Sequence, residues 1–189
     1  MKESKYYKVL KENIVQCTLC PKFCTIRDNE VGDCGVRINK YGVIQSLVYA
    51  KPCSIAIDPI EKKPLYHFLP GSTIYSIGTV GCSLHCKFCQ NFTTSQAKPE
   101  DVPHINLEPK EAVDDAKSNG CKSIAFTYNE PTIFFEYALD IMKLAKNARI
   151  KNVIVSDGFT NPEPLKEWCK YLDAANIDLK AFNEKFYKE

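Results

Sequence analysis

From residue 73 onward, short apolar runs alternate with amphipathic segments, and this alternation constrains the fold more than any other feature of the chain. The apolar runs predict four strands, over Thr73–Thr79, Lys122–Tyr128, Asn152–Ser156 and Ala174–Leu179. The amphipathic segments predict three helices, over Leu107–Ser118, from Pro131 through Ala145, and over Pro162–Leu172. Strands that alternate with helices in this way form a parallel sheet with right-handed crossovers. The sequence therefore predicts an α/β fold.

Polar and metal-binding residue types follow each predicted strand at the point where it ends. In parallel sheets, functional groups collect at the carboxyl ends of the strands. We therefore expect the four strand ends to form one site. Its candidate residues are Cys82–Cys89 after the first strand, Asn129 and Glu130 after the second, Ser156 and Asp157 at the third, and Asp178 and Lys180 at the fourth.

The segment Gly81–Asn91 carries three cysteines, Cys82, Cys86 and Cys89, at C-x₃-C-x₂-C spacing. A loop this short can direct three thiolates at three irons of one cubane iron–sulfur cluster. A cubane held only by protein takes four Cys, so one iron would remain for a ligand that is not protein. Two alternatives stay open, a zinc site completed by His85 or a distant residue, and inert core thiols. A structural zinc site would not require four converging strand ends, which favours the cluster.

A second group of thiols, Cys17, Cys20, Cys24 and Cys34, has C-x₂-C-x₃-C-x₉-C spacing with glycines beside the last cysteine. In a reducing compartment, ten cysteines in 189 residues are better explained as metal ligands or catalytic groups than as disulfides. Four clustered thiols suit structural zinc and a second iron–sulfur cluster about equally, and a purely structural use of the thiols is the third alternative.

The remaining sequence sets the class of protein and its division into parts. Residues 1–16 predict a short amphipathic helix, and residues 36–70 a small β-rich segment broken by prolines. We expect an N-terminal Cys-rich module over residues 1–72 and a core over residues 73–189. A net charge of +2 and the absence of a long apolar run argue against nucleic-acid and membrane partners. We therefore expect a cytoplasmic protein.

The order of these motifs resembles the glycyl-radical-enzyme activase branch of the radical S-adenosylmethionine (SAM) superfamily. It is most similar to the radical SAM component of the AmmeMemoRadiSam system, a group related to pyruvate formate-lyase activating enzyme. The C-x₃-C-x₂-C loop carries the resemblance to the superfamily, and Cys17–Arg37 and Thr127–Pro131 carry it to the subgroup. The resemblance implies a partial (β/α) barrel of the radical SAM type that follows a small Cys-rich, β-containing module.

The resemblance also implies roles for individual residues. Cys82, Cys86 and Cys89 would ligate a [4Fe–4S] cluster whose open iron is chelated by SAM. Glu130 would contact the SAM amino group, although here Asn129 replaces the glycine that relatives carry before the acidic residue. A plain alternative for Glu130 is a charge at a helix N-terminus, and for Asp178 with Lys180 a local ion pair. The other residues implied to lie near SAM are Phe88, beside the adenine, and Ser156, Asp157, Asp178 and Lys180.

The implied activity is [4Fe–4S]-dependent reductive cleavage of SAM to a 5′-deoxyadenosyl radical that abstracts a hydrogen atom from a substrate. The implied partners are SAM and a low-potential electron donor such as a ferredoxin or flavodoxin, and a protein is one candidate substrate. Relatives have six βα units, and two units beyond the four strands would need about 60 residues. We therefore expect a truncated or split gene product that is active either alone or with a complementing second chain. The alternative is a non-enzymatic metal-binding or electron-transfer remnant.

Overall fold

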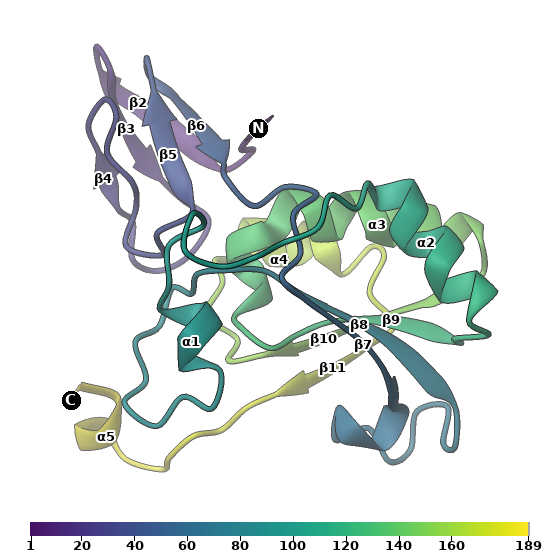
Figure 1. The fold of residues 1–189 in the computed structure, drawn as a ribbon. Coiled ribbons are helices and arrows are strands. Elements are labelled where there is room, and N and C mark those ends of the chain that lie inside the picture. The colour runs from purple at the N-terminus through teal and green to yellow at the C-terminus, as the bar shows by residue number, and fades with distance from the viewer. Residues whose placement is uncertain (189) are drawn as a thin grey trace.

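The computed structural model describes residues 1–188 and shows a mixed α/β protein built on one five-stranded sheet (Figure 1). The strand order is β11-β10-β9-β8-β7; β8 to β11 are parallel, and β7 pairs antiparallel with β8. The four parallel strands predicted from the sequence are therefore confirmed. The strands are β7 (Ser54–Pro59), β8 (Thr73–Gly78), β9 (Ser123–Phe126), β10 (Lys151–Ser156) and β11 (Ala174–Ile177).

Three predicted helices connect the parallel strands and lie together along one side of the sheet (Figure 1). They are α2 (Pro109–Ser118), η2 (Pro131–Phe134) continuing into α3 (Phe135–Asn147), and α4 (Pro162–Trp168). Each begins with proline, whose fixed φ suits the first helical position and whose missing N–H would have no helical partner. Three further helices are short: η1 (Ile60–Lys62), α1 (Phe92–Ser95) and α5 (Glu184–Lys188). Within residues 1–188, no helix is both long and apolar enough to cross a membrane.

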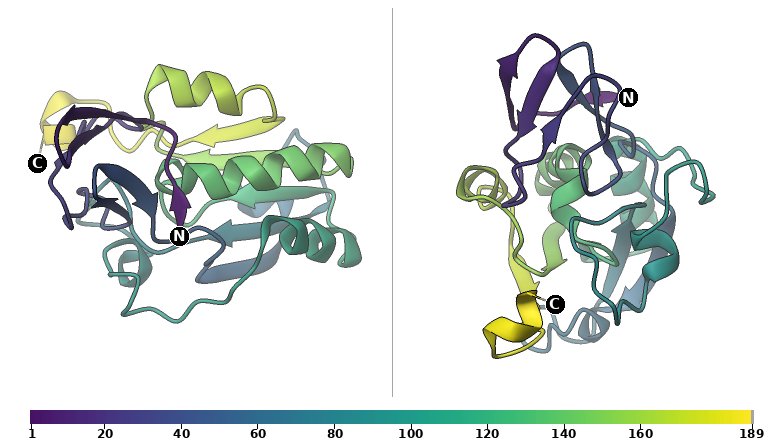
Figure 2. Two further views of the ribbon diagram at one scale, coloured as in Figure 1. Left: turned by 90° about the horizontal axis from the view of Figure 1, so that it is seen from above. Right: turned by 90° about the vertical axis from the view of Figure 1, so that its left-hand side faces the viewer.

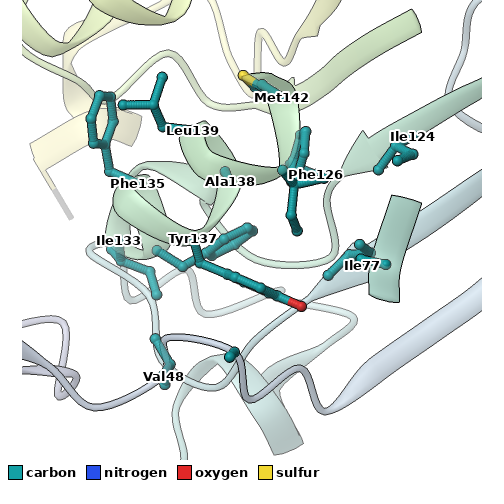
Figure 3. Packing of buried hydrophobic residues seen from close by; sticks show 14 of the residues in the cluster. Val48, Ile77, Ile124, Phe126, Ile133, Phe135, Tyr137, Ala138, Leu139 and Met142 are labelled. Atoms are coloured by element: carbon teal, nitrogen blue, oxygen red, sulfur yellow. The ribbon is translucent and has the colours of Figure 1, made fainter. Parts of the chain in front are cut away.

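The main core lies between the sheet and α3 (Figure 3). Phe126 and Ile77 of the sheet pack there against the buried face of α3, which includes Tyr137 and Met142. Burial of each such side chain stabilises the fold by about 1.5–3 kcal/mol. The Tyr137 hydroxyl donates to the Leu107 carbonyl at 2.7 Å, so its polar atom is satisfied inside the core. This packing fixes the strand ends that carry the candidate site.

The N-terminal residues form two small antiparallel sheets that stand away from the main sheet (Figures 1 and 2). The helix predicted over residues 1–16 is wrong. Residues 7–17 form a hairpin that turns at Asn13, whose φ is +54°. Val9, Ile14 and Val15 are β-branched, which favours strands. This preference outweighed the helical spacing of apolar residues on which the predicted helix rested. The strands are β1 (Lys2–Glu3), β2 (Tyr7–Lys11), β3 (Ile14–Cys17), β4 (Thr25–Ile26), β5 (Arg37–Lys40) and β6 (Val43–Ser46).

A buried ion pair ties the N-terminal strands to the helical layer. Arg37 of β5 lies 2.6 Å from Glu136 of α3, and both side chains are almost fully buried. Strand β7 also comes from residues 1–72, yet it pairs along its whole length with β8 of the main sheet. The division of the chain at residue 72 stays a prediction, and both contacts couple the two predicted parts closely.

Candidate functional site

One cavity of about 630 Å³ is lined by residues that follow all four parallel strands. The predicted convergence of the four strand ends is therefore confirmed. Every residue proposed for the main site from the sequence contributes to this cavity. The set is Cys82, Cys86, Phe88, Cys89, Asn129, Glu130, Ser156, Asp157, Asp178 and Lys180.

Three thiols from one loop line the cavity. Cys82 is buried, whereas Cys86 and Cys89 are partly exposed. Burial raises the pKa of the Cys82 thiol to about 11, and burial also raises the pKa of Cys86. In residues 1–188, no three His, Cys, Asp or Glu side chains are gathered closely enough to hold a metal ion. The thiols therefore share a cavity and a loop, and their ligation of a metal stays a proposal.

Two asparagines hold both ends of the thiol loop to the segment that follows β9. The Asn129 amide donates to the carbonyls of Thr79 and Gly81, at 2.8 and 2.6 Å, just before the loop. The Asn91 amide, just after the loop, donates to the Tyr128 carbonyl at 2.7 Å. Asn129 is buried, and its side-chain oxygen has no hydrogen-bond partner within the described residues. The Asn129 side chain thus braces the loop.

Glu130 is buried at the centre of the site and joins two strand ends. Its carboxylate accepts hydrogen bonds from the Thr132 hydroxyl at 2.7 Å, the Ser156 hydroxyl at 2.8 Å and the Asp157 backbone N–H at 2.8 Å. Burial raises the pKa of Glu130, and these donors act against that rise. Because Glu130 also caps the first turn of η2, it has the helix-terminus role that the sequence left open as an alternative. Glu130 is also one of the residues that line the cavity.

Charged side chains that follow β10 and β11 also line the cavity. Lys180 forms a short ion pair with Asp178 and lies 3.2 Å from Asp157. The local ion pair considered from the sequence for Asp178 and Lys180 is therefore present, and Asp157 joins it. Phe88 is exposed over half of its surface, and its ring centre lies 5.5 Å from that of Phe186 in α5.

The second thiol group lines a separate, small cavity of about 20 Å³ next to the main site. Its loop packs directly on the start of the first thiol loop. Gly81 has φ of +89°, and a Cβ there would lie 2.6 Å from the Cys34 carbonyl oxygen, so a side chain is excluded. Asp33, beside Cys34, lies 3.0 Å from the His85 ring. The thiols that line the small cavity are Cys17, Cys20, Cys24 and Cys34.

Comparison with known proteins identifies the family. The family model described as "Radical SAM superfamily" matches residues 76–189, which include every strand end of the cavity. The chain belongs to the radical SAM superfamily. It is also 41% identical over all 189 residues to "Uncharacterized protein MJ0808" of Methanocaldococcus jannaschii. The chain spans 56% of the length of that relative.

Membership of the radical SAM superfamily implies a [4Fe–4S] cluster, SAM and a reductant, and the residues of the cavity fit these groups. Soft thiolates are the usual ligands of iron–sulfur clusters, and Cys82, Cys86 and Cys89 supply three from one loop. A cavity of about 630 Å³ is within the range of small-molecule sites. The unpartnered side-chain oxygen of Asn129 offers a buried acceptor for an N–H donor.

Sequence reasoning missed several residues that build this site. Asn91 and Tyr128 hold the thiol loop, and Lys62 and Lys63 line the cavity from the segment between β7 and β8. Both lysines were expected within the β-rich segment over residues 36–70 and not at the site. The available signal was Asp58, a carboxylate that follows the apolar run Ile55–Ile57 and comes shortly before the two lysines in the sequence.

Proposed function

We propose that this chain carries out [4Fe–4S]-dependent reductive cleavage of SAM and directs the resulting 5′-deoxyadenosyl radical at a substrate hydrogen. We further assign it to the activase-like branch, similar to the AmmeMemoRadiSam radical SAM enzymes and pyruvate formate-lyase activating enzyme. The observation that carries the proposal is the single cavity shared by three thiols of one loop and by Glu130, Asp178 and Lys180. The motif order of residues 17–37 and 127–131 supports the branch.

In this proposal each group has a role that its chemistry suits. Cys82, Cys86 and Cys89 would hold the cluster, which supplies one-electron chemistry when bound. The Glu130 carboxylate would accept a hydrogen bond from the SAM amino group, and Lys180 would neutralise the SAM carboxylate. Asn129 fixes the loop backbone through its bonds to Thr79 and Gly81. Ser156 and Asp157 orient Glu130, and Phe88 would cover the adenine.

The direct test is formation of 5′-deoxyadenosine by the anaerobically reconstituted chain with dithionite or reduced flavodoxin as the electron donor. Absorbance near 400 nm identifies an iron–sulfur cluster and distinguishes it from zinc. A reconstituted cluster without SAM cleavage would contradict the proposed enzyme and leave the electron-transfer alternative. Cleavage of SAM by the parent protein would support the proposal.

Replacing Glu130 with glutamine is expected to weaken SAM binding about 10- to 100-fold, because a charge-assisted hydrogen bond contributes roughly 1.5–3 kcal/mol. Calorimetric titration of the reconstituted protein with SAM measures this change. Glu163→Gln is the matched control, since Glu163 is an exposed carboxylate on α4. Thermal unfolding of each variant reports whether the lost cap of η2 has disrupted the fold. Unchanged SAM affinity in folded Glu130→Gln would contradict the assignment.

We also propose that Cys17, Cys20, Cys24 and Cys34 hold a separate metal ion. Their cavity of about 20 Å³ has room for one atom rather than a cluster, which favours zinc over a second iron–sulfur cluster. We expect about one zinc per chain by elemental analysis, lost in Cys20→Ala/Cys34→Ala but retained in the control Cys169→Ala, whose thiol is exposed. A parent protein with neither zinc nor iron beyond one cubane would contradict this site.

A further inference from the structure

A second charged cluster faces the main cavity from the side of the sheet opposite α2, α3 and α4. After β7, the chain turns through η1 below the sheet, where Ile60 packs on the sheet residues Ile74 and Ala125 (Figure 1). This packing brings Lys62 and Lys63 to the wall of the cavity that also contains the three thiols. The proposed function gives no role to either lysine.

Lys63 is buried, which is rare for a lysine unless its charge is compensated. Only 4% of its side chain is exposed, and its ammonium lies 2.8 Å from the buried carboxylate of Asp58. Lys62 is 63% exposed and donates to the other oxygen of Asp58 at 2.7 Å. Burial raises the pKa of Asp58, but hydrogen bonds from both lysines outweigh burial and hold that pKa well below its usual value. Two ammonium groups therefore face one ionised carboxylate, which leaves one net positive charge.

The surrounding structure positions this cluster. The Tyr128 ring lies 4.7 Å from the Lys63 ammonium, and the Tyr128 hydroxyl donates to Asp58 at 3.3 Å. Tyr128 has φ of +74°, an uncommon conformation for a side-chain-bearing residue that often marks a functional site. Gly78 makes room for it, since a Cβ there would lie 2.8 Å from the Tyr128 ring. Tyr128 immediately precedes Asn129 and Glu130, so one segment connects the lysine cluster to the proposed SAM site.

The lysines retain donors for a ligand. An ammonium has three N–H donors. Within residues 1–188, Asp58 is the hydrogen-bond partner of Lys62, which leaves two of its donors. Lys63 donates to Asp58 and faces the Tyr128 ring. Burying such a pair costs desolvation energy that apolar side chains would avoid, so stability alone does not explain a charged wall at this position.

We infer that Lys62 and Lys63 form a subsite for an anionic group of the substrate, either a carboxylate or a phosphate. This inference rests on the proposed function and adds the substrate class to it. With SAM at the strand ends, an anionic group held at this wall would anchor the substrate inside the same cavity as the thiols. The anchor would fix which substrate hydrogen faces the SAM end of the cavity.

The test is anion binding by the reconstituted protein with SAM already bound, so that the carboxylate of SAM occupies its own site. Inorganic phosphate and succinate are titrated separately by calorimetry at constant ionic strength set with sodium chloride. We expect one of them to bind saturably, which also distinguishes a phosphate from a carboxylate substrate. Lys62→Gln should weaken that binding about 3-fold and Lys62→Glu at least about 10-fold. Both variants alter an exposed residue and avoid leaving Asp58 without Lys63.

The control is Lys110→Gln, which removes the same charge from an exposed lysine on α2. Equal anion affinity in the parent and Lys62→Glu, or no saturable binding of either anion, would overturn the subsite. Failure of the proposed function is detected separately, because the parent would then not bind SAM in the first step of the same titration. If Lys110→Gln lowers the anion affinity as much as Lys62→Gln does, the effect is one of general charge, and this result would also overturn the subsite.

Discussion

The triple variant Cys82→Ala/Cys86→Ala/Cys89→Ala is expected to lose about four iron atoms per chain and all SAM cleavage. The three thiols are soft donor groups that line the large cavity, and a cubane cluster without them would have no protein anchor. Under the proposed function, the cluster would supply the electron for cleavage of the SAM bond, so its loss would leave no slower route through other residues. Iron analysis and the yield of 5′-deoxyadenosine after anaerobic reconstitution measure the two effects.

The matched control for this variant is Cys169→Ala, since Cys169 is an exposed thiol outside both cysteine groups. The control should retain the iron content and the activity of the parent. If the triple variant keeps the full iron content of the parent, the assignment of the cluster to this loop is wrong. Iron that persists at a lower level in the triple variant would report metal at the N-terminal thiols.

The second large effect is expected in stability, from the buried ion pair between the N-terminal strands and α3. Glu136→Ala should lower the free energy of unfolding by about 3–5 kcal/mol, because it leaves the buried Arg37 guanidinium uncompensated. Arg37 donates to both Glu136 oxygens and to the Ile133 carbonyl, and the Lys5 backbone N–H also donates to Glu136. Denaturant unfolding monitored by circular dichroism gives the change.

Two comparisons test the reason for this loss. The double variant Arg37→Met/Glu136→Leu removes both charges and should recover most of the lost stability, since apolar residues of similar size avoid the desolvation cost. Asp114→Ala breaks the exposed pair with Lys110 and should cost less than about 1 kcal/mol. A cost below about 1 kcal/mol for Glu136→Ala itself would contradict the role of the buried pair.

The core elements were predictable because local sequence and tertiary packing agree there. The apolar strands β8 to β11 are separated by helices that begin at proline, and each of these features is readable from a few adjacent residues. The N-terminal hairpin was not predictable in the same way. Its apolar residues Tyr7, Leu10 and Ile14 also match a helical period, and only the pairing of β3 with β2 and β4 decides between helix and strand.

The candidate site also has features that the sequence predicted and features that only the tertiary structure shows. The sequence determined the thiol loop, the strand ends and their convergence, because parallel strands place their carboxyl ends at one edge of a sheet. Only the tertiary structure decided that Asn91 and Asn129 brace this loop, that Cys34 packs against Gly81, and that Lys63 reaches the same cavity from below the sheet. The contacts of Asn91, Asn129 and Cys34 join residues 37 or more positions apart. Their partners are selected by packing geometry, which no local pattern of residue types encodes.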